Sequence, residues 1–352
     1  MTGLSDMKTP AGPAVRFDNV SIVFGDNPER ALPLMDDGKT RAEVQTATGQ
    51  VLGVHDCRLD VDEGEILVLM GLSGSGKSTL LRAVNGLNPV CRGAVLVSDG
   101  NGLVDVTHAD AGTLRRIRLT RVAMVFQQFG LLPWRTVREN VGLGLELGGM
   151  AEKERRARID AQLELVNLTQ WADRKVGELS GGMQQRVGLA RAFATEAPIL
   201  LMDEPFSALD PLIRARLQDE LLDLQATLRR TIIFVSHDLD EAFKIGNRIA
   251  LMEGGRIVQC GTAREIIANP VSDYVADFVA HMNPLGVLTA RDVMGKGAGT
   301  GGRPVDADTP VRMVMELLRD EGADLTVTEA GIPIGVIRAS DVIARLIDPR
   351  GS

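Results

Sequence analysis

The sequence predicts an α/β fold built on a largely parallel sheet, and three observations support this prediction. Short apolar runs of strand length recur along the chain and alternate with helical segments, an order typical of parallel sheets. The run 66–70 leads into a glycine-rich turn and a helix. The run 199–204 ends in two carboxylates, Asp203 and Glu204. Because ligands of such sheets bind at the carboxyl ends of the strands, the sequence places a binding site there.

Length and charge limit the class of protein. At 352 residues the chain has room for about two domains. Its apolar and charged fractions, 44% and 24%, are those of an ordinary globular protein. A net charge of −8, with no dense run of lysine and arginine, argues against nucleic acid or anionic lipid as the main partner. The three cysteines lie far apart in the sequence and have no C-x-x-C spacing, so we expect reduced thiols. No apolar run has the length of a membrane span.

The N-terminal part is predicted to be a flexible tail followed by two strands. Residues 1–13 contain no hydrophobic signal core, so we expect a loose tail in a protein that is not secreted. Residues 15–24 alternate as a strand does and end at Phe24, which either stacks on an adenine ring or belongs to the core. Residues 26–53 are polar, poorly periodic and interrupted by turn-forming dipeptides. Strand character resumes at 52–65.

The stretch GLSGSGKST at 71–79 has the pattern that forms a phosphate cradle when it joins a strand to a helix. Its glycines allow a tight turn, so that successive N–H groups converge on one anion at the helix N-terminus. Lys77 supplies a positive charge for the β- and γ-phosphates, and Ser78 places a hydroxyl at the Mg²⁺ position. The alternative is an ordinary glycine-rich turn with a solvated lysine.

The segments after this loop predict a flank and a helical region. Residues 93–97 and 102–106 favour a hairpin, and 122–126 favours a buried strand that ends at Gln127. Residues 152–168 have the pattern of a charged amphipathic helix.

A second helix N-terminus with free N–H groups is predicted within LSGGMQQR, residues 179–186. Ser180 is a favourable N-cap and the two glycines open the backbone. This end can therefore hold a second anion, or the far side of the same one. A further strand at 231–235 ends shortly before His237.

Several of these polar residues have a plain structural alternative when taken singly. His237 fits a buried, hydrogen-bonded histidine, Glu204 a helix-capping carboxylate and Gln127 a polar loop residue. Taken together with the other motifs, these residues favour a functional role over the structural one. Its motifs stand in this order along the chain: the phosphate loop at 71–78, Gln127, LSGGM at 179–183, Asp203-Glu204, SALD at 207–210, and His237. This order resembles that of the ATP-binding-cassette (ABC) ATPases over roughly residues 14–270.

The resemblance implies a P-loop cassette at 14–284, with a RecA-like core, an antiparallel β flank and a helical subdomain at about 129–196. It implies a homodimer that holds two ATP molecules in its seam. One subunit's contacts to ATP would come from Phe24, Gly71, Ser73, Gly74, Ser75, Gly76, Lys77, Ser78 and Thr79. The other subunit's would come from Ser180, Gly181, Gly182 and Asp210, the last of which would connect the two sites.

The same resemblance implies the catalytic roles. Glu204 would polarise the attacking water and His237 would contact the γ-phosphate. Mg²⁺ would be held by Ser78, Gln127 and, through water, Asp203. Gln127 would also report occupancy of the site to a membrane partner.

More narrowly, the cassette is similar to the ATPase subunits of osmoprotectant and quaternary-amine importers. The segment 26–53, the phrase MGLSGSG at 70–76 and the run SALDPLIRARLQDELLDLQ carry this similarity. It implies a peripheral subunit on the cytoplasmic face of the plasma membrane. This subunit would drive a permease that imports choline, glycine betaine or proline with a periplasmic or extracellular binding protein. Residues 129–134, exposed yet apolar, would contact the permease.

The C-terminal residues 285–352 predict a small α+β unit. A flexible stretch at 295–303 precedes a helix from Thr309-Pro310, strands at 325–328 and 335–337, and a helix near Asp341. This order resembles one cystathionine-β-synthase (CBS) motif, which would pair with that of a second copy. Its exposed face is predicted to contain Val314, Met315, Leu318 and Ile337. Arg338 stands where nucleotide-binding versions carry Ser or Thr, which favours a dimer contact over a ligand site.

Two other functions remain as alternatives. The first is a permease-free ABC ATPase acting on ribosomes or nucleic acid, which the single cassette and acidic charge disfavour. The second is a regulatory nucleotide sensor, which the intact Glu204 disfavours.

Overall fold

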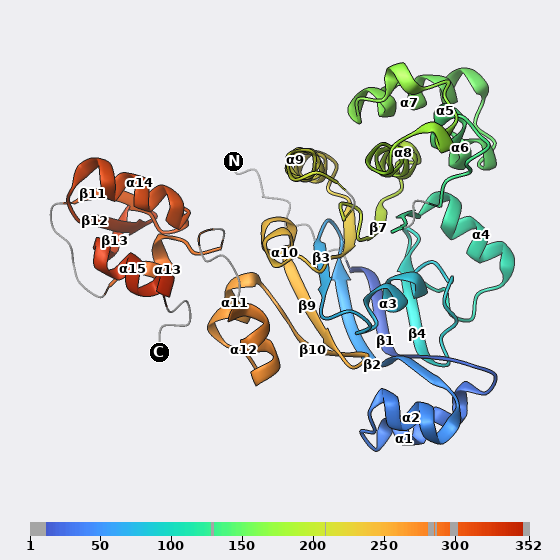
Figure 1. Ribbon diagram of the computed structural model, residues 1–352, viewed down its shortest axis with the longest axis horizontal. Helices are drawn as coiled ribbons and strands as arrows, with labels where there is room; N and C mark the ends of the chain where they lie inside the picture. Colours follow the sequence, from blue (N-terminus) through green and yellow to red (C-terminus); the bar gives the residue numbers. More distant parts are fainter. Residues whose placement is uncertain are drawn as a thin grey trace, which may run out of the picture. The chain divides into compact units, whose positions relative to one another are not determined.

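The computed structural model describes residues 12–127, 130–207, 209–280, 285, 287–295 and 302–347 (Figure 1). The chain divides into two units, Met1–His237 with Met252–Ile257 and Asp238–Leu251 with Val258–Ser352. Among the helices of the described ranges, none is both long and apolar enough to cross a membrane.

The main sheet confirms the α/β prediction. Its strand order is β10-β9-β3-β8-β7-β6, and β3 with β8, β8 with β7, and β7 with β6 pair in parallel. The strands are β3 (Ile66–Met70), β6 (Val122–Val125), β7 (Ile199–Asp203), β8 (Thr231–Val235), β9 (Arg248–Glu253) and β10 (Arg256–Gly261). Every residue of β3, β7 and β8 is buried, as expected for continuous apolar runs in a covered parallel sheet.

A second, antiparallel sheet forms the expected flank. Its order is β2-β1-β4-β5, with strands at β1 (Pro13–Phe24), β2 (Val51–Asp62), β4 (Arg92–Ser98) and β5 (Leu103–Asp105). The hairpin predicted from the sequence is the β4–β5 pair, in which Leu96 faces Asp105.

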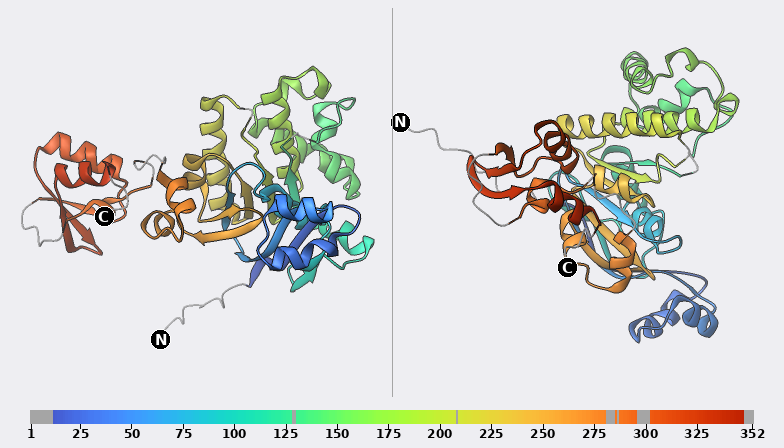
Figure 2. Two further views of the ribbon diagram at one scale, coloured as in Figure 1. Left: turned by 60° about the horizontal axis from the view of Figure 1, so that its bottom comes forward. Right: turned by 60° about the vertical axis from the view of Figure 1, so that its left-hand side comes forward.

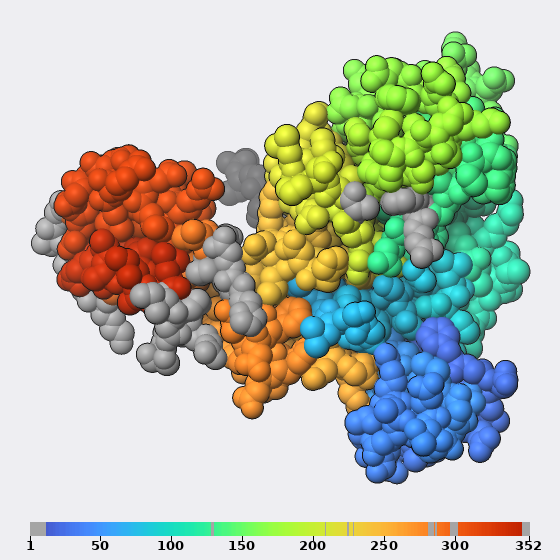
Figure 3. All heavy atoms as spheres, in the orientation of Figure 1, coloured from blue at the N-terminus to red at the C-terminus, as the bar shows by residue number. Residues whose placement is uncertain are grey.

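The segment between β1 and β2 is helical, which the sequence analysis did not predict. It contains η1 (Pro28–Ala31), α1 (Leu32–Asp36) and α2 (Arg41–Thr48). We call residues 26–50 the insert; it is drawn in blue and protrudes from the flank (Figures 1 and 3). Met35 and Val44 of the insert are fully buried in a small core with Val23 and Leu52 of the flank. Helix α2 begins at a capping box, in which Thr40 and Glu43 bond each other's backbone N–H groups.

The remaining helices of this unit follow the phosphate loop along the chain. They are α3 (Lys77–Ala83), α4 (Ala111–Thr120), α5 (Val137–Val141), α6 (Leu143–Leu147), α7 (Glu152–Leu165), α8 (Gly181–Ala194) and α9 (Pro211–Leu228), with short 3₁₀ turns η2 (Thr169–Trp171) and η3 (Val176–Glu178). Helices α5 to α8 form a separate group in both Figures 1 and 2. This group has its own hydrophobic core, which includes Val141, Leu163 and Val187.

The second unit carries a three-stranded sheet in the order β11-β12-β13. Strand β11 pairs in parallel with β12, and β12 pairs antiparallel with β13. Its elements are α10 (Leu239–Ile245), α11 (Ala263–Ala268), α12 (Asp273–Ala280), α13 (Ala290–Val293), β11 (Arg303–Asp306), α14 (Val311–Glu321), β12 (Leu325–Glu329), β13 (Ile332–Ile337) and α15 (Ala339–Ile347). From β11 onward the order is β-α-β-β-α; its helix, two strands and last helix lie where the sequence predicts them, and β11 precedes them.

Two details of this unit differ from the sequence analysis. Val314 and Ile337, predicted on an exposed face, are fully buried in the unit's own core, and Leu318 packs partly against it. Of the four predicted residues only Met315 is exposed. The predicted flexible stretch also ends earlier, because Arg303 begins β11, while residues 296–301 lie outside the described residues.

Candidate active site

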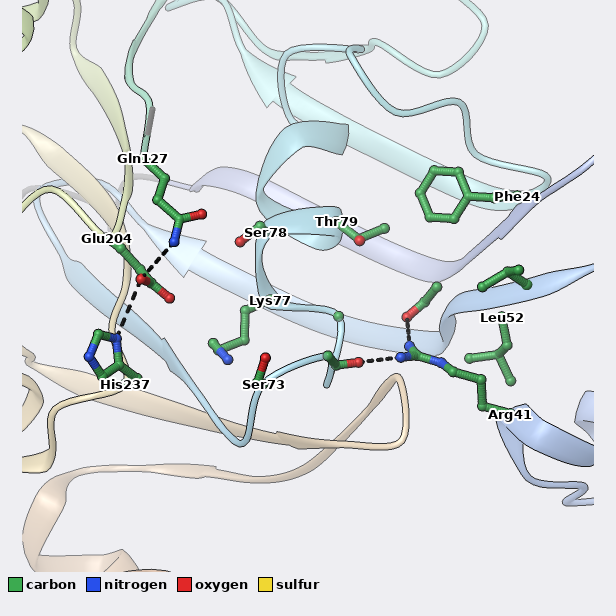
Figure 4. A pocket seen from close by; sticks show the side chains of 14 residues that line it. Phe24, Arg41, Leu52, Ser73, Lys77, Ser78, Thr79, Gln127, Glu204 and His237 are labelled. Atoms are coloured by element: carbon green, nitrogen blue, oxygen red, sulfur yellow. Dashed lines mark hydrogen bonds and ion pairs between the residues drawn. The ribbon is translucent and has the colours of Figure 1, made fainter. Parts of the chain in front are cut away.

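A pocket of about 610 Å³ brings together residues from separate parts of the first unit. It is lined by Phe24, Arg41, Val51, Leu52, Gly53, Ser73, Gly74, Gly76, Lys77, Ser78, Thr79, Gln127, Glu204 and His237. Figure 4 shows the phosphate-loop residues at its centre, with Glu204 and His237 toward one end and Phe24 and Arg41 toward the other. The pocket therefore has a carboxylate and an imidazole at one end, and an aromatic ring and a guanidinium at the other.

The phosphate loop has the geometry that the glycine pattern predicts. Gly71, Gly74 and Gly76 have φ of +141°, +81° and +102°, which side chains disfavour. A Cβ atom on Gly71 would lie 2.1 Å from the carbonyl oxygen of Met252, so only glycine fits there. The loop leads directly into α3, which begins at Lys77.

Lys77 is held at the bottom of the loop. Its Nζ donates to the carbonyl oxygens of Gly71 at 2.8 Å and Leu72 at 3.0 Å. Burial lowers the pKa of Lys77, and the nearby carboxylates of Glu204 and Asp203 oppose this effect. A buried ammonium of this kind is an electrostatic site for an anion such as a phosphate group.

Asp203 lies beneath Ser78, at the carboxyl end of β7. Its side chain is 0% exposed, and its Oδ1 accepts a 2.6 Å hydrogen bond from Ser78 Oγ. Its Oδ2 accepts from Arg82, at 3.2 Å from Nε and 2.8 Å from Nη2. Arg82 was not among the predicted site residues, although Ser78 and Arg82 are spaced i, i+4 on α3 and so share a face. A hydroxyl beside a carboxylate is a donor set that suits Mg²⁺.

Glu204, the residue after β7, is the centre of a polar triad. Its φ is +48°, a left-handed conformation that is uncommon for a non-glycine residue and marks functional sites. Its Oε2 accepts from Gln127 Nε2 at 2.9 Å and lies 3.4 Å from His237 Nδ1 (Figure 4). The side chain of His237 is 64% exposed, so it is not a buried structural histidine. Glu204 caps no helix either, since α9 begins at Pro211.

Phe24 lines the opposite end of the pocket. It is 39% exposed, which excludes the core alternative. The backbone of Gly53 passes close beneath it, because a Cβ on Gly53 would lie 2.9 Å from Phe24 Cε2 and 3.1 Å from Thr79 Cγ2. The ring is thus available to a planar ligand.

Some predicted site residues lie outside this pocket. Ser180, Gly181, Gly182 and Asp210 do not line it. Ser180 is the N-cap of α8, as predicted, and its Oγ accepts from Met183 N at 3.4 Å. Gly71 and Ser75 shape the phosphate loop without lining the pocket, and Ser75 is buried.

Arg41 is a site residue that the sequence analysis did not identify. It enters the pocket from the insert, where it is the first residue of α2. A sequence signal for this position exists, because Thr40 and Glu43 form the S/T-x-x-E pattern of a capping box.

The parallel sheet, the phosphate loop and the carboxylate at the end of β7 together define a P-loop nucleoside triphosphatase. The comparisons with known proteins agree. Residues 54–207 match the family model described as ABC transporter. The chain is similar to a dimeric structure of MJ0796, a bacterial ABC transporter cassette, with 30% identity and a TM-score of 0.61 over 70% of this chain and 98% of that one. A post-hydrolysis state of the same cassette, bound to ADP and Pi, matches with 31% identity and a TM-score of 0.61 over the same shares of the two chains.

Relatives of known function match over most of the chain. The glycine betaine/proline betaine transport ATP-binding protein ProV of Salmonella typhimurium is 45% identical over 95% of this chain and 82% of its own length. The trimethylamine N-oxide transport ATP-binding protein TmoW of Ruegeria pomeroyi is 43% identical over 94% of this chain and 96% of its own length. The chain therefore belongs to the ABC transporter family, among its ATP-hydrolysing subunits, as its motifs predicted.

Proposed function

We propose that this chain is the ATPase subunit of an importer for choline or a related quaternary amine. The observation that carries the proposal is the pocket in which Lys77, Glu204 and His237 meet around the phosphate loop. The names of the relatives support the substrate class, since they include glycine betaine, proline betaine and trimethylamine N-oxide transport. None of them favours action on ribosomes or nucleic acid.

The side chains of the pocket would divide the work of hydrolysis. Lys77 and the N–H groups of the loop would bind the β- and γ-phosphates, and Phe24 would stack on the adenine ring. Glu204 would orient and deprotonate the attacking water, because its carboxylate lies at the phosphate end of the pocket. His237, 3.4 Å from that carboxylate, would contact the γ-phosphate.

Mg²⁺ would be held by Ser78, by Gln127 and, through water, by Asp203. These groups offer hydroxyl, amide and carboxylate oxygens, which are the ligands that Mg²⁺ prefers. Gln127 donates to Glu204 through Nε2, which leaves its Oε1 for the metal. The ion would neutralise charge on the phosphate oxygens during transfer.

The active form would be a head-to-tail homodimer. Ser180, Gly181 and Gly182 begin a helix and do not line the pocket of their own chain, which suits a role on the ATP of a second copy. Asp210 would connect the two sites. The similar MJ0796 cassette is dimeric, which supports this arrangement.

The permease would contact the surface beside Gln127. A pocket of about 660 Å³ there is lined by Arg82, Leu87, Asn88, Phe126, Gln127 and Gly130. Leu87 and Trp134 expose 48% and 68% of their surface, and apolar exposure of this kind marks docking sites. Phe129, the first residue of the predicted contact segment, lies outside the described residues. This contact would hold the chain at the cytoplasmic face of the membrane, and a binding protein outside would deliver the substrate.

The tail, residues 285–352, would be a single CBS-like motif that pairs with that of a second copy. Its β-α-β-β-α order and three-stranded sheet support this assignment. Asp341 has a local role, because its Oδ2 accepts from Arg338 N at 3.1 Å at the start of α15. Pairing therefore has more support than ligand binding.

The test is reconstitution of the chain with its permease and binding protein in lipid vesicles. ATP hydrolysis should rise when choline is added, and glycine betaine and trimethylamine N-oxide serve as competing substrates. If glycine betaine or trimethylamine N-oxide stimulated ATP hydrolysis and choline did not, that compound would take the place of choline as the proposed substrate. Absence of ATPase activity in the vesicles, with each substrate tested, would reject the proposal itself.

A further inference from the structure

The insert has no part in the function described so far, yet it reaches the nucleotide pocket. We propose that Arg41 of the insert is a positioning residue that holds the phosphate loop in its anion-binding conformation. This inference rests on the proposed function, because it assumes that the pocket binds the phosphates of a nucleotide.

The first support is the pair of contacts that Arg41 makes. Its Nη1 donates to the carbonyl oxygen of Gly74 in the phosphate loop. Its Nη2 donates to the carbonyl oxygen of Gly53 in β2, at 3.2 Å. One guanidinium thus ties the loop to the flank strand, as Figure 4 shows. The fork geometry of the guanidinium lets Arg41 hold both carbonyl oxygens with two different nitrogens.

The second support is the conformational freedom of the loop itself. Gly74 has a φ of +81°, and glycine loses more backbone entropy on ordering than any other residue. Other carbonyl oxygens of the loop are held from within the cassette core. Lys77 holds those of Gly71 and Leu72, and Gly255 N donates to that of Ser75 at 3.1 Å. The carbonyl of Gly74 is held from the insert instead, so Arg41 reduces the entropy that phosphate binding would otherwise cost.

The third support is that Arg41 projects from a fixed base. Asp36 in α1 accepts two 2.8 Å hydrogen bonds from Arg92 of β4, and its Oδ1 lies 3.0 Å from His55 Nε2. Arg256 Nη2 donates to the carbonyl oxygen of Met35 at 2.8 Å. These contacts, with the buried core of the insert, attach the insert to the flank independently of Arg41. Removing the Arg41 side chain therefore leaves the insert in place.

The experiment measures binding of ADP and GDP to the full chain by calorimetry, since neither is hydrolysed. Arg41→Ala should weaken the binding of both nucleotides by about 10- to 100-fold, the effect of losing charge-assisted hydrogen bonds. The affinity of Arg41→Lys should lie between those of Arg41→Ala and the wild type, because lysine keeps the positive charge but lacks the forked guanidinium. Arg30→Ala, at an exposed arginine of the same insert, is the matched control and should bind as the wild type does.

Each other result has a defined meaning. Loss of ADP binding alone would make Arg41 a contact to the base and overturn the positioning role. A fall in the unfolding midpoint without nucleotide, as large as that of Asp36→Ala, would show that Arg41 merely attaches the insert. Wild-type binding by Arg41→Ala, with binding lost in Lys77→Ala, would reject the inference and keep the proposed site. Wild-type binding by Lys77→Ala would reject the site itself.

Discussion

The contact between Arg82 and Asp203 predicts a large loss of stability when Arg82 is replaced. Asp203 is 0% exposed and accepts three hydrogen bonds, one from Ser78 and two from Arg82. Arg82→Ala removes two of the three donors and leaves the buried carboxylate without its guanidinium partner. A carboxylate in this position should destabilise the folded state.

The magnitude follows from the burial of the two partners. Breaking a fully buried ion pair costs about 3–5 kcal/mol. The side chain of Arg82 is 37% exposed and Ser78 still bonds Asp203, so water and the hydroxyl offset part of the loss. We expect the free energy of unfolding to fall by about 2–3 kcal/mol. The free energy of unfolding of the double variant Arg82→Ala/Asp203→Asn should lie within about 1 kcal/mol of that of Asp203→Asn alone, because the buried negative charge is gone.

Urea unfolding followed by tryptophan fluorescence is the assay. Trp134 and Trp171 both belong to the unit that contains Asp203, so their signal reports on that unit. Arg115→Ala, at an exposed arginine of α4, is the control and should leave the midpoint unchanged. The reasoning would be refuted if Arg82→Ala lowered the free energy of unfolding equally in the wild type and in Asp203→Asn. The effect would then not depend on the buried charge.

Further predictions concern hydrolysis, the shared site, the tail and one thiol. Glu204→Gln should keep ATP binding and slow hydrolysis by roughly 10²- to 10⁴-fold, the range for a positioned general base; single-turnover rates close to wild type would remove Glu204 from the mechanism. A Ser180→Arg chain mixed with a Lys77→Ala chain should form a dimer with one intact composite ATP site, which size-exclusion chromatography in ATP would detect. If the LSGGM motif instead acted on the ATP of its own chain, the mixture would contain no intact site and no dimer would form. Truncation after Asn283 should leave basal hydrolysis intact and weaken nucleotide-free association, because tethered tails have a high effective concentration. Disulfides between Met315→Cys chains, at an exposed position of α14, should form in the transporter, and their absence would count against pairing. Burial raises the pKa of Cys57 to about 12, so its thiol stays protonated at pH 9 in the folded chain while an unfolded chain begins to ionise. Stability should therefore decline between about pH 9 and 12, and mass spectrometry at pH 9 should find Cys57 alkylated only after unfolding.

The sheet and the phosphate loop could be predicted because their signals are local. Strands such as β3 and β7 are continuous apolar runs, and a strand buried on both faces needs such a run. The glycines at 71, 74 and 76 are required by their own φ angles, and a pattern search detects them at once.

The insert could not be predicted in the same way because its stability is not local. Its helices are short, and α1 contains Pro33. Helices of this length are stable only through tertiary packing. Here the packing comes from isolated apolar residues such as Met35 and Val44, which meet Val23 and Leu52 of two different strands. Arg41 was missed for this reason, since its partners lie 12 and 33 residues away in the sequence.

The tail shows the opposite error, in which a correct periodicity was assigned the wrong partner. Val311, Val314 and Leu318 have the i, i+3, i+7 spacing of one helix face, as predicted. That face packs on the sheet of its own unit, where Val311 and Val314 are fully buried. Periodicity identifies an apolar face but does not distinguish a partner within the chain from one on a second copy. The exposed apolar residues of α14, Met313 and Met315, are displaced from this face and are the remaining candidates for contact.

The end of the pocket that contains Glu204 departs from local backbone preference. Glu204 has a positive φ without being glycine, and the backbone is held there by a hydrogen bond from its N–H to Val235 O at 3.2 Å and by Ser207 Oγ donating to its carbonyl at 3.0 Å. This conformation costs of order 1–3 kcal/mol, which the neighbouring strand and turn must offset. Its effect is to direct the carboxylate toward Gln127 and His237 rather than along the sheet. Arg82 and Arg41 act similarly from two other directions, one on the carboxylate of Asp203 and one on the carbonyl of Gly74. Fixed polar contacts therefore hold Glu204, Asp203 and the phosphate loop in place, and phosphoryl transfer requires preorganisation of this kind.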